Sequence, residues 1–397
     1  MLMRNLSYME KLLDGIEVEW KVLGKVVKTV TAPAKLKKDA YRVTGEVPII
    51  DQGLQFISGY TDENITPVES GEYIVFGDHS EHIKYVDFAF IQGADGLKIL
   101  SPISDNAKYV YYAFQNFYQK ALSYKRHWST AKETLVPIPC PDNLEKSLQI
   151  QAEIVRIVDT FTELTAELTA ELTARKKQYN YYRDQLLSFD KGEVEWKTLG
   201  EEDFFEVASG GTPSKSKPEY WDKGNIPWLK SESCNNEPVN LANNCITELG
   251  LQKSSAKFLD KETTLIALVG ATIFKTAFLE FPAATNQNIA SIKSKKPEAI
   301  NDKFVFYYIT NLYEVLKSEM RNYGMLNLTT LRQLKIPVPS PEEQERIVTI
   351  LDKFDTLTHS ISEGLPREIE LRQKQYEYYR DLLLSFPKPT PEVMAEA

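Results

Sequence analysis

A fifteen-residue segment, Arg175-Lys-Lys-Gln-Tyr-Asn-Tyr-Tyr-Arg-Asp-Gln-Leu-Leu-Ser-Phe189, occurs twice in this chain of 397 residues. It returns as Arg372-Gln-Lys-Gln-Tyr-Glu-Tyr-Tyr-Arg-Asp-Leu-Leu-Leu-Ser-Phe386, 197 residues further on. Internal similarity of this kind signals repeated structural units. Further matches keep the same order, such as Trp20 with Trp196. We therefore predict a tandem duplication whose two halves would close into a circle if the ends were joined.

Each half contains a block of short apolar runs and one long helical segment. In the first block, runs at 47–50, 73–76 and 85–90 lie between Gly, Pro, Asn and Asp residues, which is typical of strands. A helix with one aromatic face is expected at 106–118, where core packing explains the aromatic residues. The second block repeats this plan with little identity. Divergent blocks between similar flanks suggest modules that read different targets on a frame that meets one kind of partner.

The predicted fold class is α+β. We expect two mixed α/β modules separated by two long antiparallel coiled-coil helices, with pseudo-twofold, circularly permuted internal symmetry. The expected parts are an N-terminal helical segment 1–19, a first module 20–140, a central spacer helix 141–190, a second module 191–339, a C-terminal spacer helix 340–387 and a flexible tail 388–397.

An apolar stripe that steps by three or four residues predicts both long helices. It runs from Ile150 to Leu172 in the first and from Ile347 to Ile361 in the second. Two Thr-Ala-Glu-Leu units follow one another at 165–172, and each unit adds about 6 Å of helix. The second helix instead carries Gly364-Leu-Pro366, where the proline is expected to kink or restart it.

Composition places the chain among ordinary globular proteins. The net charge of −9 lies in the flanks and helices, because residues 20–139 and 197–339 each carry a net charge of +1. The global charge therefore does not exclude DNA binding by the modules. The three cysteines show no CxxC spacing, and no run is long and apolar enough to span a bilayer, so we expect a cytoplasmic protein.

Sequence motifs of catalysis are missing from the chain. There is no Walker loop, no HExxH, no G-x-S-x-G and no Asn/Asp-Pro-Pro-Tyr/Phe tetrapeptide of an amino-methyltransferase. His79 and His82 have a metal-like spacing, but without a third ligand nearby a polar surface loop explains them better. Carboxylate pairs such as Asp62-Glu63 are better explained as solvated loop acids. We expect a non-catalytic chain without a metal of its own.

If the modules read DNA, the contacts should come from polar and basic loops near glycines. Solvated surface and simple chain reversal are the alternatives for the same residues. The candidates in the first module are Gln52, His79, Ser80, Lys125, Arg126 and His127. The candidates in the second module are Gly210, Gly211, Thr212, Ser214, Lys215, Lys230, Ser231, Asn286, Gln287 and Asn288.

The chain resembles the DNA specificity subunits of type I restriction–modification systems. The resemblance rests on the Gly210-Gly-Thr-Pro-Ser-Lys215 turn, the Ile-Pro-Trp of 226–228, the Ala-Ala-Thr-Asn-Gln-Asn-Ile of 283–289 and the proline-rich ends of both modules. The Thr-Ala-Glu-Leu units and the repeated Lys-Gln-Tyr-x-Tyr-Tyr-Arg-Asp segments are similar to the IC subfamily in particular. The likeness covers essentially the whole chain.

The resemblance implies a division of labour between this chain and its partners. Each module would read one half of a split double-stranded DNA target, and the helices would set the spacer. Two modification subunits would carry S-adenosylmethionine and methylate adenine at N6, and two restriction subunits would bring ATP, Mg²⁺ and cleavage. This chain would carry no cofactor itself. The residues expected to share helix packing with partner docking are Tyr179, Tyr182, Arg183, Tyr376, Tyr379 and Arg380.

A second interpretation stays open at this stage. The same helices could belong to a coiled-coil scaffold for protein interactions, with two peptide-binding modules. A nuclease or a methyltransferase that acts alone is disfavoured because the corresponding motifs are missing from the sequence.

Overall fold

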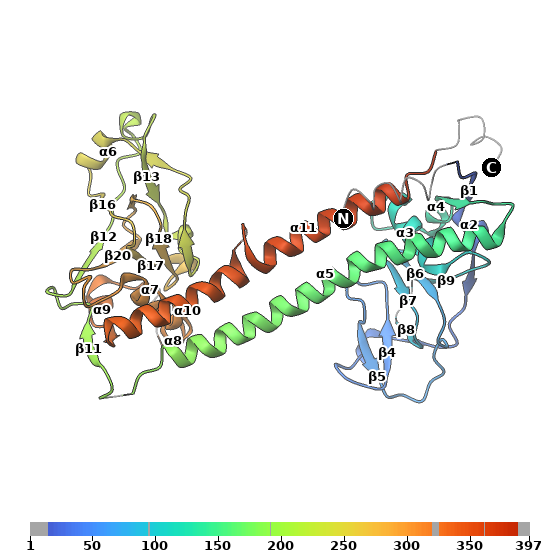
Figure 1. The fold of residues 1–397 in the computed structure, drawn as a ribbon, viewed down its shortest axis with the longest axis horizontal. Coiled ribbons are helices and arrows are strands. Elements are labelled where there is room, and N and C mark those ends of the chain that lie inside the picture. The colour runs from blue at the N-terminus through green and yellow to red at the C-terminus, as the bar shows by residue number, and fades with distance from the viewer. Residues whose placement is uncertain (1–14, 94–95, 191, 320–324, 361, 388–397) are drawn as a thin grey trace. The chain divides into compact units, whose positions relative to one another are not determined.

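The computed structural model describes residues 15–387 except 94–95, 191, 320–324 and 361. The chain forms two compact units (Figure 1). The first unit comprises residues up to 168 and from 368 onward, and the second comprises residues 169–367. Each unit therefore contains one module and two helical segments that come from distant parts of the sequence. Each module has a two-stranded sheet that carries a tryptophan. In the first it pairs β1 (Val18–Val22) with β10 (Leu135–Pro139), and in the second it pairs β11 (Glu195–Thr198) with β21 (Lys335–Val338).

The first module contains two four-stranded sheets, in the orders β2-β9-β6-β7 and β3-β8-β4-β5. The first sheet is antiparallel, whereas β4 and β8 run parallel in the second. Its strands are β1 (Val18–Val22), β2 (Val27–Val30), β3 (Lys35–Leu36), β4 (Val47–Ile50), β5 (Gly59–Thr61), β6 (Tyr73–Gly77), β7 (Ile83–Val86), β8 (Ile91–Gly93), β9 (Leu97–Pro102) and β10 (Leu135–Pro139). Its helices are α2 (Leu23–Val26), η1 (Lys38–Ala40), α3 (Ala107–Phe117) and α4 (Trp128–Ala131).

The second module repeats this architecture with sheets in the orders β12-β20-β17-β18-β14 and β15-β13-β19-β16, and β13 runs parallel to β19. Its strands are β11 (Glu195–Thr198), β12 (Phe205–Ser209), β13 (Ile226–Leu229), β14 (Glu237–Val239), β15 (Cys245–Ile246), β16 (Phe258–Leu259), β17 (Thr264–Ala267), β18 (Thr276–Leu279), β19 (Ala283–Thr285), β20 (Ile289–Ser294) and β21 (Lys335–Val338). Its helices are η2 (Pro218–Tyr220), η3 (Ser231–Ser233), α6 (Glu248–Gln252), η4 (Gly270–Thr272), α7 (Asp302–Asn311), α8 (Tyr313–Glu319) and α9 (Leu328–Arg332).

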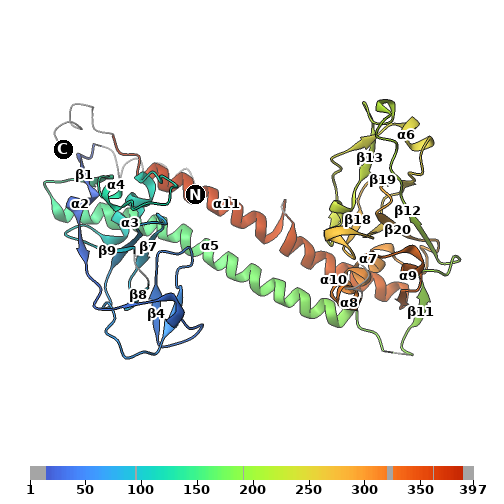
Figure 2. The same cartoon turned by 180° about the vertical axis from the view of Figure 1, so that it is seen from behind.

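An asparagine starts the main helix of each module. Asn106 accepts hydrogen bonds from the backbone N–H of Lys108 and Tyr109, and Asn301 does the same for α7. Such N-caps stabilise a helix by about 1 kcal/mol. Beyond its cap, each helix buries an aromatic face against a sheet of its own module, as the sequence pattern predicts. Figure 2 shows α3 and α7 from behind, each beside its own sheet.

The two long helical segments differ in continuity. Helix α5 (Leu144–Leu186) is unbroken over 43 residues, whereas its counterpart consists of α10 (Pro341–His359) and α11 (Gly364–Leu383). Gly364 has φ +75°, and a Cβ there would clash with the carbonyl oxygen of Thr356. Pro366 lies in the first turn of α11, where no helical donor is lost. The predicted effect of Pro366 is therefore confirmed as a restart of the helix.

Helical segments pack through aromatic rings in each unit. In the first unit the rings of Phe161 and Tyr379 stack with centroids 4.9 Å apart. In the second unit Phe354 packs against Tyr179 and Tyr182, at 6.1 and 5.9 Å. Tyr182, later in α5, contacts Phe354, whereas Tyr179, earlier in α5, also contacts His359, which lies later in α10. The two helices therefore run antiparallel.

Two boundaries differ from the sequence-based expectation. Of the run at 85–90, only Tyr85 and Val86 lie in a strand, since β7 spans Ile83–Val86, and Phe90 instead forms an isolated bridge with Val68. The N-terminal helical segment 1–19 and the tail 388–397 lie largely outside the described residues, of which Val18 and Glu19 already belong to β1. Within the described residues, no helix combines the length and apolarity required to cross a membrane.

Candidate nucleic-acid interface

The predicted contact residues gather at equivalent places in the two modules. In the first, β4 and β8 pair in parallel as Ile49 with Ile91 and Ile50 with Gln92. In the second, β13 and β19 pair in parallel, with Leu229 opposite Thr285. Residues that follow parallel strands leave the sheet at the same edge, where ligand-binding loops of such sheets are commonly found. We call this edge, with the loops that pack on it, the recognition edge of each module.

Gln52 organises the recognition edge of the first module. Its side-chain oxygen accepts a hydrogen bond from the backbone N–H of His79 at 3.2 Å. Its carbonyl oxygen contacts the Ser80 hydroxyl, which donates to it, and lies 3.1 Å from Nδ1 of His82. The structure therefore brings Gln52 together with His79 and Ser80, which lie 27 and 28 residues further along the sequence.

A buried lysine supports the loop that carries Gln52. The Nζ of Lys84 donates to the carbonyl oxygens of Asp51 and Gln55 at 2.8 and 2.6 Å. Burial lowers the pKa of Lys84, and the carboxylate of Asp51 counteracts part of this effect. The sequence shows Lys84 only as one residue of a strand, so this role was not predicted.

The basic segment 124–127 of the first module divides into an exposed and a buried part. Lys125 and Arg126 are exposed, and the ring of Tyr124, 93% exposed, stacks on the ring of His79. His127 is only 1% exposed, and its Nε2 lies 2.7 Å from the carbonyl oxygen of Ser123. The ring of His127, which was predicted to contact DNA, is therefore not accessible at the surface. The exposed Tyr124 was not among the predicted contact residues.

In the second module, the Gly-Gly-Thr-Pro turn packs against the residues after β19. A Cβ on Gly210 would clash with the carbonyl of Thr285, so this glycine serves close packing. Beside it, the Thr212 hydroxyl donates to the side-chain oxygen of Gln287 at 2.5 Å. Asn286 is buried and caps the backbone N–H of Asn288 at 3.1 Å.

The remaining candidates of the second module keep accessible surface. Ser214, Lys215 and Gln287 are exposed, and Thr212, Lys230, Ser231 and Asn288 are partly exposed. Because Gly210, Gly211 and Asn286 shape the turn instead, we leave them out of the contact surface proposed below.

A hollow of about 380 Å³ lies next to this recognition edge. Trp221 and Trp228 meet edge to face at 5.1 Å, and Lys215, Lys230 and Asn244 also line the hollow. The Nε1 of Trp228 donates to the carbonyl of Gly211 at 3.0 Å, which ties the wall to the glycine turn. Aromatic faces, ammonium groups and an amide are the groups that contact bases and phosphates. Trp221 and Asn244 were not among the predicted residues.

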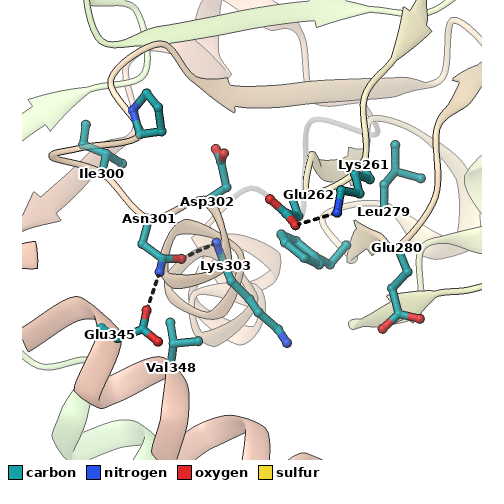
Figure 3. A pocket seen from close by; sticks show the side chains of 12 residues that line it. Lys261, Glu262, Leu279, Glu280, Ile300, Asn301, Asp302, Lys303, Glu345 and Val348 are labelled. Atoms are coloured by element: carbon teal, nitrogen blue, oxygen red, sulfur yellow. Dashed lines mark hydrogen bonds and ion pairs between the residues drawn. The ribbon is translucent and has the colours of Figure 1, made fainter. Parts of the chain in front are cut away.

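A larger hollow of about 510 Å³ in the second unit lies at the start of α7 (Figure 3). Several polar groups around it are paired: Asn301 donates to Glu345 at 3.2 Å, and Lys303 and Asp302 lie 2.8 Å from Asp352 and Lys293 respectively. Burial raises the pKa of Asp302, although Lys293 and the N–H of Ser294 favour the carboxylate. These contacts join the start of α7 to α10 and to strand β20.

The expected partner-binding residues lie on the repeated helical segments. Tyr179 and Tyr379 are buried against Phe354 and Phe161, whereas Tyr182, the counterpart of Tyr379, is 40% exposed. Arg183 and Arg380 lie over the rings of Tyr179 and Tyr376, both at 5.6 Å, and each pairs with the following aspartate.

A pair of exposed tyrosines was missed by the sequence reasoning. Tyr181 and Tyr378 occupy equivalent positions and are 59% and 54% exposed. On the same helix face, the exposed residues Lys177 and Asp184 correspond to Lys374 and Asp381. We call these two sets, Lys177–Tyr181–Asp184 and Lys374–Tyr378–Asp381, the frame faces. Asp184 and Asp381 pair with the preceding arginines, whereas the side chains of Tyr181 and Tyr378 are both more than half exposed.

The described residues contain no group of three His, Cys, Asp or Glu side chains placed to hold a metal ion. The described residues thus form two modules of similar architecture, whose equivalent edges carry different side chains, on a helical frame repeated in each unit.

Comparison with known proteins identifies the family. The model of the type I restriction modification DNA specificity domain matches residues 16–175 and again residues 193–371. The chain is 46% identical to the EcoR124I/EcoR124II type I restriction enzyme specificity subunit of Escherichia coli, over 98% of this chain and 99% of that protein. It is 32% identical to a putative type I restriction enzyme specificity subunit of Haemophilus influenzae, over 96% and 99%. The chain therefore belongs to the family of type I restriction–modification DNA specificity subunits.

Solved structures confirm the fold. The type I restriction–modification S subunit from M. genitalium superposes with a TM-score of 0.61 at 18% identity, covering 95% of this chain and 98% of that one. A chain from a study of complex assembly and conformational transition of the type I system gives a TM-score of 0.59 at 15% identity, covering 94% and 98%. The predicted α+β class with long helices is thus confirmed.

Proposed function

We propose that this chain reads a bipartite DNA target for a type I restriction–modification enzyme. The first module contacts one half-site through Gln52, His79, Ser80, Lys125 and Arg126. The second contacts the other through Thr212, Ser214, Lys215, Lys230, Ser231, Gln287 and Asn288. The long helices set the spacing between the half-sites. The chain itself performs no catalysis and works in the cytoplasm.

The observation that carries the proposal is the contrast between equivalent regions of the two units. Lys108 and Tyr112 of the first module donate to Asp159 of α5, just as Lys303 and Tyr307 of the second module donate to Asp352 of α10. The two recognition edges, by contrast, present different residue types. A protein that must be held in one way and read two different sequences needs this combination, because sequence is read by side chains at base edges.

The frame faces support the partner part of the proposal. Two equivalent sets of exposed Lys, Tyr and Asp fit two copies of one partner, since tyrosine supplies contact area and the charges supply orientation. We propose that these partners are two modification subunits, which bind S-adenosylmethionine and methylate adenine at N6. Two restriction subunits, which use ATP and Mg²⁺, join through them. Relatives named as restriction enzyme specificity subunits support this assignment.

The test is co-expression of the full chain with the modification subunit of its own system, in a bacterial host without other adenine methylation. We expect N6-methyladenine at one bipartite motif, and a gel shift with duplex DNA of that motif in the presence of the partner. Absence of methylation and of DNA binding, with or without the partner, would overturn the proposal in favour of the protein scaffold.

A further inference from the structure

An exposed basic loop, residues 119–126, projects from the first module between α3 and α4. It contains no helix or strand, and all of its residues are exposed, including Tyr124, Lys125 and Arg126. A loop with so little apolar burial gains little stability from its own packing. Its conformation must therefore come from specific hydrogen bonds.

One buried carboxylate holds the beginning of this loop. Glu81 accepts hydrogen bonds from the Tyr118 hydroxyl at 2.6 Å and from the backbone N–H of Ala121 and Leu122, both at 2.8 Å. Burial alone would raise the pKa of Glu81, but these three donors and the nearby His127 outweigh it and leave the pKa below its ordinary value. Glu81 is therefore a charged anchor at neutral pH.

A second buried carboxylate holds the end of the loop. Asp78 accepts from the backbone N–H of His127 and Trp128 at 2.9 and 2.8 Å. Directly after the loop, Nε2 of His127 lies 2.7 Å from the carbonyl oxygen of Ser123, and its Nδ1 lies 3.6 Å from Glu81. His127 thus links the loop to both anchors from a buried position.

Both anchors lie in the turn after β6, which also carries His79 and Ser80. This turn contacts Gln52 on one side, and its His79 ring stacks on Tyr124 at 5.5 Å with an interplanar angle of 24° on the other. The loop is consequently fixed against the recognition edge. Burying two carboxylates is costly unless several donors satisfy each of them, as they do here.

We propose that loop 119–126 is a finger that contacts duplex DNA beside the first half-site, with Asp78, Glu81 and His127 as its positioning residues. Lys125 and Arg126 neutralise phosphates, and the fixed loop keeps them in register with the bases that Gln52 and its neighbours read. The inference rests on the proposed function and changes His127 from a contact to a positioning residue.

The anchors are specific to the first module. The corresponding turn after β17, Leu268–Lys275, contains no carboxylate residue. Loss of an anchor should therefore affect reading of one half-site only. A general loss of stability would not select between half-sites.

The experiment compares Glu81→Gln with the wild-type chain, each co-expressed with the modification subunit, by mapping N6-methyladenine. We expect the half-site read by the first module to become degenerate or its methylation to fall about tenfold, while the other half-site keeps its sequence. Glu72→Gln is the matched control, since Glu72 lies at the opposite end of β6 and bonds only Tyr85 in the described structure. An unchanged first half-site in a folded Glu81→Gln complex would overturn the inference.

A second variant leaves the anchors intact in case Glu81→Gln fails to fold. For Lys125→Ala/Arg126→Ala, we expect the slope of log K against log salt concentration to shrink by about 2. A salt-dependence slope equal to that of the wild-type complex would overturn the proposal that this loop contacts DNA. Wild-type complex that methylates no bipartite motif would instead refute the proposed function, so the two failures are distinguishable.

Discussion

The two units attach their modules in the same way but present different recognition edges. On α5, Asp159 accepts from the ammonium of Lys108 at 2.7 Å and from the hydroxyl of Tyr112 at 2.5 Å. On α10, Asp352 accepts from the ammonium of Lys303 at 2.8 Å and from the hydroxyl of Tyr307 at 2.5 Å. The same lysine, tyrosine and aspartate thus join module to helix in both units.

A second shared contact lies about two helical turns earlier. Gln151 and Gln344 are both buried, and each accepts a hydrogen bond at 2.8 Å from the backbone N–H of the capping asparagine of its module. At the edges, by contrast, Gln52 is the centre of one network and Thr212 with Gln287 forms the other. The duplication has kept the attachment and changed the edge, which is how one frame can carry two different reading modules.

Exchange of a whole module is the largest test of this comparison. Replacing residues 200–335 with the second module of another specificity subunit should replace one half-site entirely and leave the other unchanged. Methylation mapping of the co-expressed complex measures it. If both half-sites changed, the modules would not be independent readers.

A change in helix length should alter the spacing alone. Inserting one Thr-Ala-Glu-Leu unit after Leu172 adds about 6 Å, or one to two base-pair steps, to α5. We expect a longer preferred spacer with both half-sites unchanged, measured on a library of targets with graded spacers. An unaltered spacer preference in a folded, active complex would refute the role of the helix in spacing.

The shared attachment can be broken on one side at a time. Asp159→Ala and Asp352→Ala each leave a lysine and a tyrosine without their acceptor, which should lower the free energy of unfolding by about 2–3 kcal/mol in either unit. Denaturant unfolding measures the loss, and Asp190→Ala, at an exposed position after α5, is a control. Clearly unequal losses would show that the two attachments are not equivalent.

The frame faces can be tested separately as well. Tyr181→Ala or Tyr378→Ala should weaken binding of one modification subunit by about 1–2 kcal/mol and leave the other in place. Analytical ultracentrifugation with the modification subunit should then detect complexes with one partner bound, and the double variant should lose both. In the chain itself, the guanidinium of Arg380 lies over the ring of Tyr376. A Tyr376→Ala variant therefore shows the effect of lost internal packing, with which the effects of Tyr181→Ala and Tyr378→Ala on docking are compared.

The smallest expected difference concerns pH. The pKa of Glu81 in the first unit lies below 4.5, so its stabilising contribution is present above that value and is lost as the pH falls through the folded pKa. The pKa of Asp302 in the second unit lies above 3.8, so its cost at neutral pH is relieved as the pH falls. Thermal unfolding of Glu81→Gln and Asp302→Asn against pH should therefore show opposite trends relative to wild type. Parallel trends would contradict this assignment.

The sequence by itself determined the features that depend on local patterns. The repeat at 175–189 and 372–386, the stripe from Ile150 to Leu172 and the restart near Pro366 follow from spacing along one helix. Capping by Asn106 and Asn301 is equally local, because the donors lie two and three residues away. Most of the fold and the family were accessible for this reason.

Tertiary structure decided which side chains of those patterns face outward. His127 looks like part of an exposed basic run, but Asp78, 49 residues earlier, binds its backbone N–H and keeps it buried. Tyr182 and Tyr379 are equivalent in sequence and stack on the equivalent rings of Phe354 and Phe161, yet one is 40% and the other 4% exposed. Burial depends on contacts between segments far apart in the chain, and local spacing carries no information about them.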